Sequence, residues 1–263
     1  MKTISVLSLN LRFGLADDGP NAWKYRKQAI VKLFNGQHPD FISTQEANSF
    51  QIDFLVNHLP DYKYIGRRTP APEFWQHNIL FYDRSITCRE HLDFFLSETP
   101  HIPSKSFGSH YPRQATLGLF QINGRSLICI DTHFDFETPA QMGAARVLKH
   151  QLAQYPKDIP LILTGDFNAT PENECYRWLT CKEANGDEGL HLKETFQKPY
   201  PGTHHGFTGT PTAGYIDWIL YRGPLNLVTC EVLQEPIGGI YPSDHFPVKA
   251  VFELQAQSDP LSI

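Results

Sequence analysis

The sequence has few cysteines, and their spacing suggests neither a metal knuckle nor a disulfide framework. Among its 263 residues are five cysteines, an odd number, and no two of them have CxxC spacing. Cys129 and Cys230 stand inside apolar runs, where we expect them to behave as small core residues. This pattern favours a reducing compartment, so we expect a cytoplasmic protein.

Long apolar segments are also missing. No apolar run approaches the ~20 residues that a membrane-spanning helix needs. The segment 4–11 has the pattern of a strand and does not resemble a signal peptide. We therefore expect no signal peptide and no association with a membrane.

The chain lacks a block of basic residues. Its net charge is −5 and its pI is about 6.2. Tight nonspecific binding to nucleic acid needs a basic surface, so this composition argues against long duplex DNA as the ligand. A metal-assisted nuclease is not excluded, because a bound cation supplies positive charge where the phosphate lies.

Repeats, low-complexity segments and linkers are absent from the sequence as well. We therefore predict one domain, residues 1–254, followed by a polar and flexible tail, residues 255–263.

Short apolar runs recur along the chain and predict strands, because most are β-branched or aromatic and bounded by turn residues. They are 4–11, 41–44, 78–82, 116–122, 126–130, 161–164, 215–221, 225–233 and 246–254. Helices are predicted at 22–35, ended by Gly36, at 138–155, opened by a capping box at Thr138, and at 170–179, capped by Thr170. Many strands and few helices predict an α/β sandwich with two packed sheets and the helices outside.

Polar side chains follow several of these strands at the points where the strands end. They are Asn10, Glu46, His133, and Asp166 with Asn168. Functional groups are commonly mounted on a rigid scaffold in this way. Oxygen ligands dominate the set and thiolates are absent, which suits Mg²⁺ or Mn²⁺ better than zinc. Histidines are able to transfer protons near neutral pH.

The motifs that contain these residues resemble those of the endonuclease/exonuclease/phosphatase superfamily, whose members include DNase I-like and exonuclease III-like enzymes. In family order they are Asn10 in SLNLRFG, Glu46 in TQEA, His133 in DTHFD, Asp166 and Asn168 in GDFN, Asp217 in YIDWI, and Asp244 and His245 in SDHFP. The segments FFLSETP, YPRQAT and THHGFTG are similar to a bacterial branch of the superfamily. The resemblance implies a four-layered α/β sandwich of two mixed β-sheets packed face to face, with the site at one end of both sheets.

The resemblance also implies a metal site and a group that activates water. Glu46 binds the metal in this interpretation, with Asn10 beside it and Asp244 either a ligand or a support for one. Asp166 orients or deprotonates the attacking water, and Asn168 holds a phosphate oxygen.

The histidines have implied roles too. His245 binds phosphate or acts as the base, while His133 stabilises the charge that develops on the phosphoryl group. Asp217 orients one of these two imidazoles, and the resemblance leaves open which one. A buried carboxylate between Ile216 and Trp218 needs a partner, so a structural salt bridge is the alternative for Asp217.

Other residues are candidates for contact with the substrate. Arg113 is suited either to clamping a phosphate with two hydrogen bonds or to pairing with a structural carboxylate. His204 and His205 are expected at the rim of the site or in contact with the substrate. Phe74 and Trp75 lie in a proline-rich loop and are candidates for stacking on the organic part of the substrate.

The sequence thus predicts a Mg²⁺- or Mn²⁺-dependent phosphoesterase in which water attacks phosphorus in line with the leaving oxygen. Phosphodiesters and phosphomonoesters both remain open, as does a nuclease acting on DNA or RNA. We expect a small-molecule or single-stranded nucleic-acid substrate, and the sequence indicates no protein partner.

Two other classes of protein fit the sequence less well. A catalytically silent binding protein on the same fold is expected to lack Glu46, Asp166, Asn168 or His245, and all of them are present. The run Ser243-Asp244-His245 suggests a hydrolase triad, but neighbours in sequence cannot point at one another as a triad requires. No GxSxG nucleophile elbow occurs either.

Overall fold

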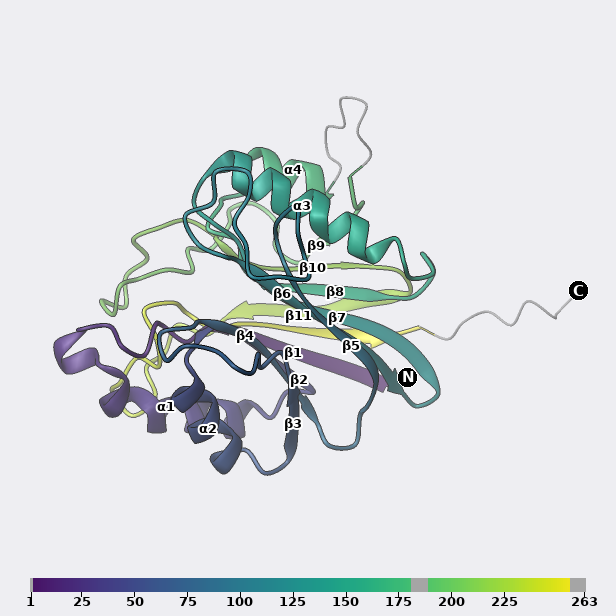
Figure 1. Cartoon of the computed structure of the whole chain (residues 1–263). Coiled ribbons are helices and arrows are strands. Elements are labelled where there is room, and N and C mark those ends of the chain that lie inside the picture. Colours follow the sequence, from purple (N-terminus) through teal and green to yellow (C-terminus); the bar gives the residue numbers. More distant parts are fainter. Residues whose placement is uncertain (1, 181–188, 256–263) are drawn as a thin grey trace, which may run out of the picture.

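The computed structural model describes residues 2–180 and 189–255, so the predicted flexible tail lies outside the described residues except for Gln255. Figure 1 shows the course of the chain. The elements in chain order are β1 (Lys2–Asn10), a 3₁₀ turn (Gly19–Asn21), α1 (Trp23–Gln37), β2 (Phe41–Ala47), α2 (Ser49–His58), β3 (Tyr62–Ile65), β4 (His77–Asp83), β5 (Thr87–Phe95), β6 (Gln114–Ile122), β7 (Arg125–His133), α3 (Thr138–Leu152), β8 (Leu161–Asp166), α4 (Glu174–Thr180), β9 (Lys193–Glu194), β10 (Asp217–Arg222), β11 (Leu225–Val232) and β12 (Val248–Leu254).

The strands form two six-stranded mixed sheets. Sheet A has the order β11-β12-β1-β2-β4-β3 and sheet B the order β5-β6-β7-β8-β10-β9. In each sheet the pairs are antiparallel except for one parallel pair at the centre, β1 with β2 and β7 with β8. The predicted pair of mixed sheets is confirmed.

The helices cover the outer faces of the sheets, which gives four layers (Figure 1). Helices α1 and α2 lie on sheet A, and α3 and α4 lie on sheet B. Apolar clusters fill each of the spaces between layers, and the middle one packs sheet A against sheet B through residues such as Val6, Phe41, Phe120 and Ile162. No helix within the described ranges is long and apolar enough to cross a membrane.

The parallel central pairs fix the place of the site. Parallel strands end at the same edge of a sheet, and Asn10 at the end of β1 is paired with Gln45 near the end of β2. In sheet B, His133 at the end of β7 is paired with Asp166 at the end of β8. Asp217, the first residue of β10, is paired with Asp166 across an antiparallel ladder. The polar strand ends that the sequence singled out are therefore gathered at one edge of the sandwich.

Several predicted helix boundaries were wrong. Gly36 does not end the first helix, which continues to Gln37 and stops where His38 takes a left-handed φ of 41°. Thr138 does not form a capping box, because it lies inside α3, and the N-cap residue, Glu137, makes no side-chain cap bond. Helix α4 begins at Glu174 rather than at 170.

Some elements escaped the sequence analysis. Helix α2 has an N-terminal capping box in which Asn48 and Gln51 each bond the other's backbone N–H. Strand β5 lies at the edge of sheet B and is mostly exposed, so it has no apolar run by which to recognise it. Strands β3 and β9 have only four and two residues, too few to show a periodic pattern.

Gly165 holds the end of β8 close to β7. Its φ is +148°, and a Cβ atom at this position would lie 2.0 Å from the carbonyl oxygen of Thr132. We predict that Gly165→Ala lowers the free energy of unfolding by ~1–3 kcal/mol or more, since the backbone of β7 must move to admit the methyl group. Urea unfolding followed by circular dichroism measures this change.

Gly36→Ala is the matched control. Gly36 lies in α1, and an added Cβ would meet no atom of the described residues within 4 Å apart from its chain neighbours and the backbone of its own helix. Alanine is therefore expected to be neutral or to stabilise by up to ~1 kcal/mol. Equal unfolding midpoints for Gly165→Ala and the wild type would contradict the close approach of β8 to β7.

Candidate active site

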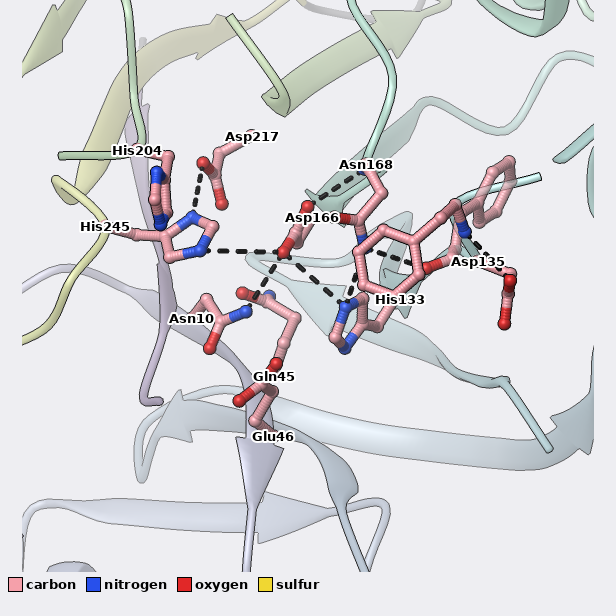
Figure 2. Close-up of polar contacts among 12 residues, drawn as sticks. Asn10, Gln45, Glu46, His133, Asp135, Asp166, Asn168, His204, Asp217 and His245 are labelled. Carbon is pink, nitrogen blue, oxygen red and sulfur yellow. Dashed lines mark hydrogen bonds and ion pairs between the residues drawn. The ribbon is translucent and has the colours of Figure 1, made fainter. Parts of the chain in front are cut away.

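Asp166 occupies the centre of the gathered polar residues (Figure 2). Its Oδ2 atom accepts a hydrogen bond from the Asn10 amide at 3.0 Å and lies 3.5 Å from His133 Nε2 and 3.9 Å from His245 Nε2. Its Oδ1 atom accepts the backbone N–H of Asn168 at 2.9 Å. Burial and the nearby charge of Asp217 raise the pKa of Asp166. Its carboxylate is consequently a better proton acceptor than one in water.

Asp217 pairs with His245, which answers the question that the sequence left open. The Nδ1 atom of His245 lies 2.9 Å from Asp217 Oδ2, and both side chains are buried. Burial disfavours the charged imidazole, but the carboxylates around it, Asp217 above all, raise the pKa of His245 to about 10. The other oxygen of Asp217, Oδ1, is buried and has no hydrogen-bond partner among the described residues. The pair orients the His245 ring with Nε2 toward Asp166.

His133 is held from the opposite side by Arg113. The Arg113 Nη1 atom lies 2.9 Å from His133 Nδ1, and the Asn168 side-chain nitrogen lies 3.0 Å from His133 Nε2. Burial, together with the positive charges of Arg113 and His245, lowers the pKa of His133 well below its ordinary value. His133 is therefore a neutral imidazole, in contrast to His245.

Glu46 reaches the site through a distortion of its strand. The pairing of β2 with β4 is irregular between Thr44 and Ala47, and Glu46 has a left-handed φ of 61°. Its carboxylate accepts the backbone N–H of Phe13 at 2.6 Å. The residue is half-buried and lines an open cavity, so one face of the carboxylate remains accessible to a ligand.

The other two predicted metal ligands are already engaged with the protein. The Asn10 side chain donates to Asp166 and accepts the backbone N–H of Arg12 at 2.9 Å. Asp244 Oδ2 lies 3.6 Å from Arg12 Nε and 4.0 Å from His204 Nε2. Both retain oxygen lone pairs, and Glu46 likewise offers only oxygen atoms, the type of ligand that Mg²⁺ and Mn²⁺ prefer.

Among the described residues, groups of three acidic or histidine side chains with metal-ligand spacing occur twice. One consists of His204, Asp244 and His245, and the other of Asp166, Asp217 and His245. Glu46 belongs to neither, so the predicted ligand set and these groups overlap only at Asp244.

His204 and His205 differ in position despite their adjacency in sequence. His204 is half-buried beside His245, with ring centroids 4.8 Å apart, which agrees with a place at the rim of the site. His205 is fully buried and stacks on Phe246, so the expectation that it lies at the rim was wrong.

A cavity of about 520 Å³ adjoins Glu46 and His133. Its lining includes Arg113 and the aromatic side chains Phe74, Trp75, Tyr111 and Phe136. Phe74, Tyr111 and Phe136 are more than half exposed. The cavity therefore offers an apolar wall next to the charged groups of the site.

The structure also reveals polar residues that the sequence analysis missed. Asp131 is fully buried beneath the site and accepts hydrogen bonds from the amides of Gln45 and Asn78. Asp135 is buried beside the cavity and accepts several backbone N–H groups. The alternation of Asp131, His133 and Asp135 along one segment was a signal that could have found them.

With this geometry established, comparison with known proteins identifies the family. The model of the Endonuclease/Exonuclease/phosphatase family matches residues 7–245, and the chain belongs to this family, whose members are hydrolases that act on phosphoesters and generally depend on divalent metals. The structure of a mannosyl-6-phosphatase from Bacteroides thetaiotaomicron VPI-5482 has a TM-score of 0.84 and 27% sequence identity, and the match covers 95% of this chain and 99% of that one.

Two of the curated relatives are much longer than this chain. Nocturnin of Drosophila melanogaster is 25% identical over 88% of this chain, and Carbon catabolite repressor protein 4 homolog 3 of Arabidopsis thaliana is 28% identical over 62%. The chain spans only 42% and 37% of these two proteins, respectively.

We predict that Asp217→Asn keeps the fold but lowers kcat by on the order of 10²–10⁴-fold, because the amide no longer stabilises the positive charge of His245 or orients its ring. A purely structural salt bridge predicts a clear fall in melting temperature instead. Both quantities are measured on the same variant. Asp40→Asn is the control, since Asp40 accepts two hydrogen bonds from Ser5 ahead of β2, at the strand end opposite the site.

Proposed function

We propose that this protein hydrolyses a P–O bond of a small phosphorylated molecule, with Mg²⁺ or Mn²⁺ as cofactor and in-line attack of water on phosphorus. The main support is the position of Asp166, a buried carboxylate with a raised pKa between two histidines of opposite charge state. Asp166 accepts the proton of the attacking water in this proposal.

The phosphate is held by N–H donors on either side of Asp166. Because Arg113 is only a donor, His133 Nδ1 accepts its hydrogen bond and the neutral ring carries its proton on Nε2. That N–H lies 3.5 Å from Asp166 Oδ2 and 3.0 Å from the side-chain nitrogen of Asn168, which also donates to the carbonyl oxygen of Phe134. In this proposal a phosphate oxygen accepts hydrogen bonds from both nitrogens, which stabilises the developing charge.

Positively charged groups complete the proposed phosphate site. His245 is cationic at neutral pH and presents Nε2 on the side of Asp166, while His204 lies at its rim. Arg113 lines the neighbouring cavity and is proposed to contact the substrate there. The charge that develops on the phosphoryl oxygens is thus met by fixed donors.

Glu46, Asn10 and Asp244 are the residues proposed to hold the divalent cation. Glu46 fits this role best, since its half-buried carboxylate faces the cavity and accepts one hydrogen bond, from Phe13, in the part of the chain that the structure describes. The cation would supply positive charge next to the phosphate.

The size of the cavity supports a small substrate. About 520 Å³ is within the range of small-molecule sites, and the walls combine aromatic rings with the amides of Gln76 and Gln114. The likeness to a mannosyl-6-phosphatase is consistent with a phosphorylated small molecule, although monoesters and diesters both fit the groups at Asp166.

Single-stranded nucleic acid is the second candidate substrate. The exposed rings of Phe74, Tyr111 and Phe136 at the cavity mouth favour it, because bases stack on such side chains. A catalytically silent binding protein is disfavoured, because Asp166 and His245 lie 3.9 Å apart and Glu46 lines the adjoining cavity. We also propose a cytoplasmic location, on the grounds that Cys88, Cys129, Cys175 and Cys230 are free thiols.

We predict that Glu46→Gln greatly weakens binding of Mg²⁺ in isothermal titration calorimetry and that chelator abolishes hydrolysis in the wild type. An amide cannot supply the charge that the cation needs. Glu253→Gln is the control, because Glu253 is paired with Thr3 at the end of the sheet far from the site. Normal Mg²⁺ affinity in Glu46→Gln would remove this residue from the ligand set.

The choice of substrate is tested with a panel of phosphomonoesters, small phosphodiesters and single-stranded oligonucleotides, each with Mg²⁺ and with Mn²⁺. We expect a small ester to be preferred and its kcat/KM to depend weakly on salt, since few phosphates are contacted. Efficient cleavage of plasmid DNA with a steep salt dependence would refute the proposed preference.

A further inference from the structure

One carboxylate organises the segment that forms a wall of the cavity. Asp135 is 2% exposed, and its Oδ2 atom accepts the Ser109 hydroxyl at 3.0 Å and the backbone N–H groups of His110 and Tyr111 at 3.0 and 3.1 Å. Its Oδ1 atom accepts the N–H of Phe136 at 2.9 Å and lies 3.1 Å from His110 Nδ1. Despite burial, these donors hold the pKa of Asp135 below its ordinary value, so the group is ionised.

The segment that Asp135 holds continues into Arg113. The Arg113 Nε atom lies 3.7 Å from Asp135 Oδ2, and the guanidinium lies over the rings of Tyr111 and Phe136 at 4.9 and 5.6 Å from their centroids. The Arg113 side chain is only 9% exposed. It is therefore fixed by the carboxylate of Asp135, by two aromatic faces and by the backbone of its own segment.

The guanidinium of Arg113 contacts His133. Its Nη1 donates to His133 Nδ1 at 2.9 Å, and a guanidinium has no acceptor to offer in return. The imidazole must then carry its proton on Nε2, the atom that lies 3.5 Å from Asp166 and 3.0 Å from the Asn168 side chain.

We propose that Arg113 and Asp135 are positioning residues that act through His133. Asp135 fixes the segment 109–113, and Arg113 thereby holds the His133 ring with its Nε2–H directed at the phosphate site. The inference rests on the proposed function for its effect on turnover, but the state of the His133 ring is a property of the protein without substrate.

The first test is therefore made without substrate, by ¹⁵N NMR of labelled histidine side chains, with the signal of His133 assigned from its loss in His133→Ala. We expect the Nε2–H tautomer in the wild type. Arg113→Met keeps an unbranched apolar stem in place of the guanidinium, so it removes the donor and should give a mixture of tautomers. A wild-type Nδ1–H tautomer, or an unchanged tautomer in Arg113→Met, overturns the proposal.

Amide hydrogen exchange tests the contribution of Asp135. In Asp135→Asn an NH₂ donor replaces one of the two accepting carboxylate oxygens. We therefore expect faster exchange at the amides of His110 and Tyr111 and a shift of His133 toward a mixture of tautomers. Unchanged exchange at both amides overturns the role of Asp135. Arg125→Ala is the matched control, since Arg125 lies at the opposite end of β7 from His133 and bonds Leu254 and Gln255.

Turnover of the ester that is hydrolysed fastest then shows whether Arg113 acts through His133 or directly on the substrate. We expect Arg113→Met to lower kcat by about 10–100-fold, and the double variant with His133→Ala to be no slower than His133→Ala alone within about twofold. If the fold-losses in kcat of the two single variants multiply in the double variant, the proposal is overturned. That result favours direct binding of the phosphate by Arg113. If no ester is hydrolysed but the tautomer changes as expected, the proposed function fails while the positioning role is supported.

Discussion

The side chains between the two sheets change from apolar to polar along each central strand, and the candidate site depends on this change. In β1 the inward positions are Ile4, Val6, Ser8 and Asn10, in β2 Phe41, Ser43 and Gln45, in β7 Leu127, Cys129, Asp131 and His133, and in β8 Ile162, Thr164 and Asp166. The apolar ends pack the sheets together, while the polar ends hydrogen-bond across the interface. Because each sheet supplies part of the site, docking of the sheets assembles it.

The hydrogen bonds that cross the interface also define the alignment of the two sheets. Ser43 and Thr164 are 2.5 Å apart, and Gln45 Nε2 donates to Asp131 Oδ1 at 2.5 Å. Burial raises the pKa of Asp131 strongly, which shows how unfavourable a free charge is at this depth. An apolar interface tolerates sliding, whereas buried polar groups are stabilised only when their partners are in place. The position of Glu46 relative to His133 is therefore tied to the Gln45–Asp131 contact.

The strand ends were predictable because period-two alternation and parallel pairing determine where they lie. Asn10, His133 and Asp166 continue the inward face of their strands, so their meeting followed from the pattern. Glu46 does not, because it follows the inward-facing Gln45 and belongs by alternation to the other face. Only the irregular pairing and the left-handed φ of 61° turn it into the site. Local distortion of this kind leaves no periodic signal in a sequence.

The substrate was not predictable for a related reason. The groups proposed to act on phosphorus lie at or beside the ends of strands of the central sheets, but the cavity wall comes from the loop that carries Phe74 and Trp75 and from the loop that ends at Arg113. The first loop is held by Asn48, whose amide donates to the carbonyl groups of Glu73 and Trp75, and the second by Asp135. These loops are tied to the scaffold at a few points, so their aromatic residues are able to change without disturbing the strands. The motifs of the family thus indicate a reaction on phosphoesters, while under the proposed function the organic group is selected by loop contacts that only the folded chain reveals.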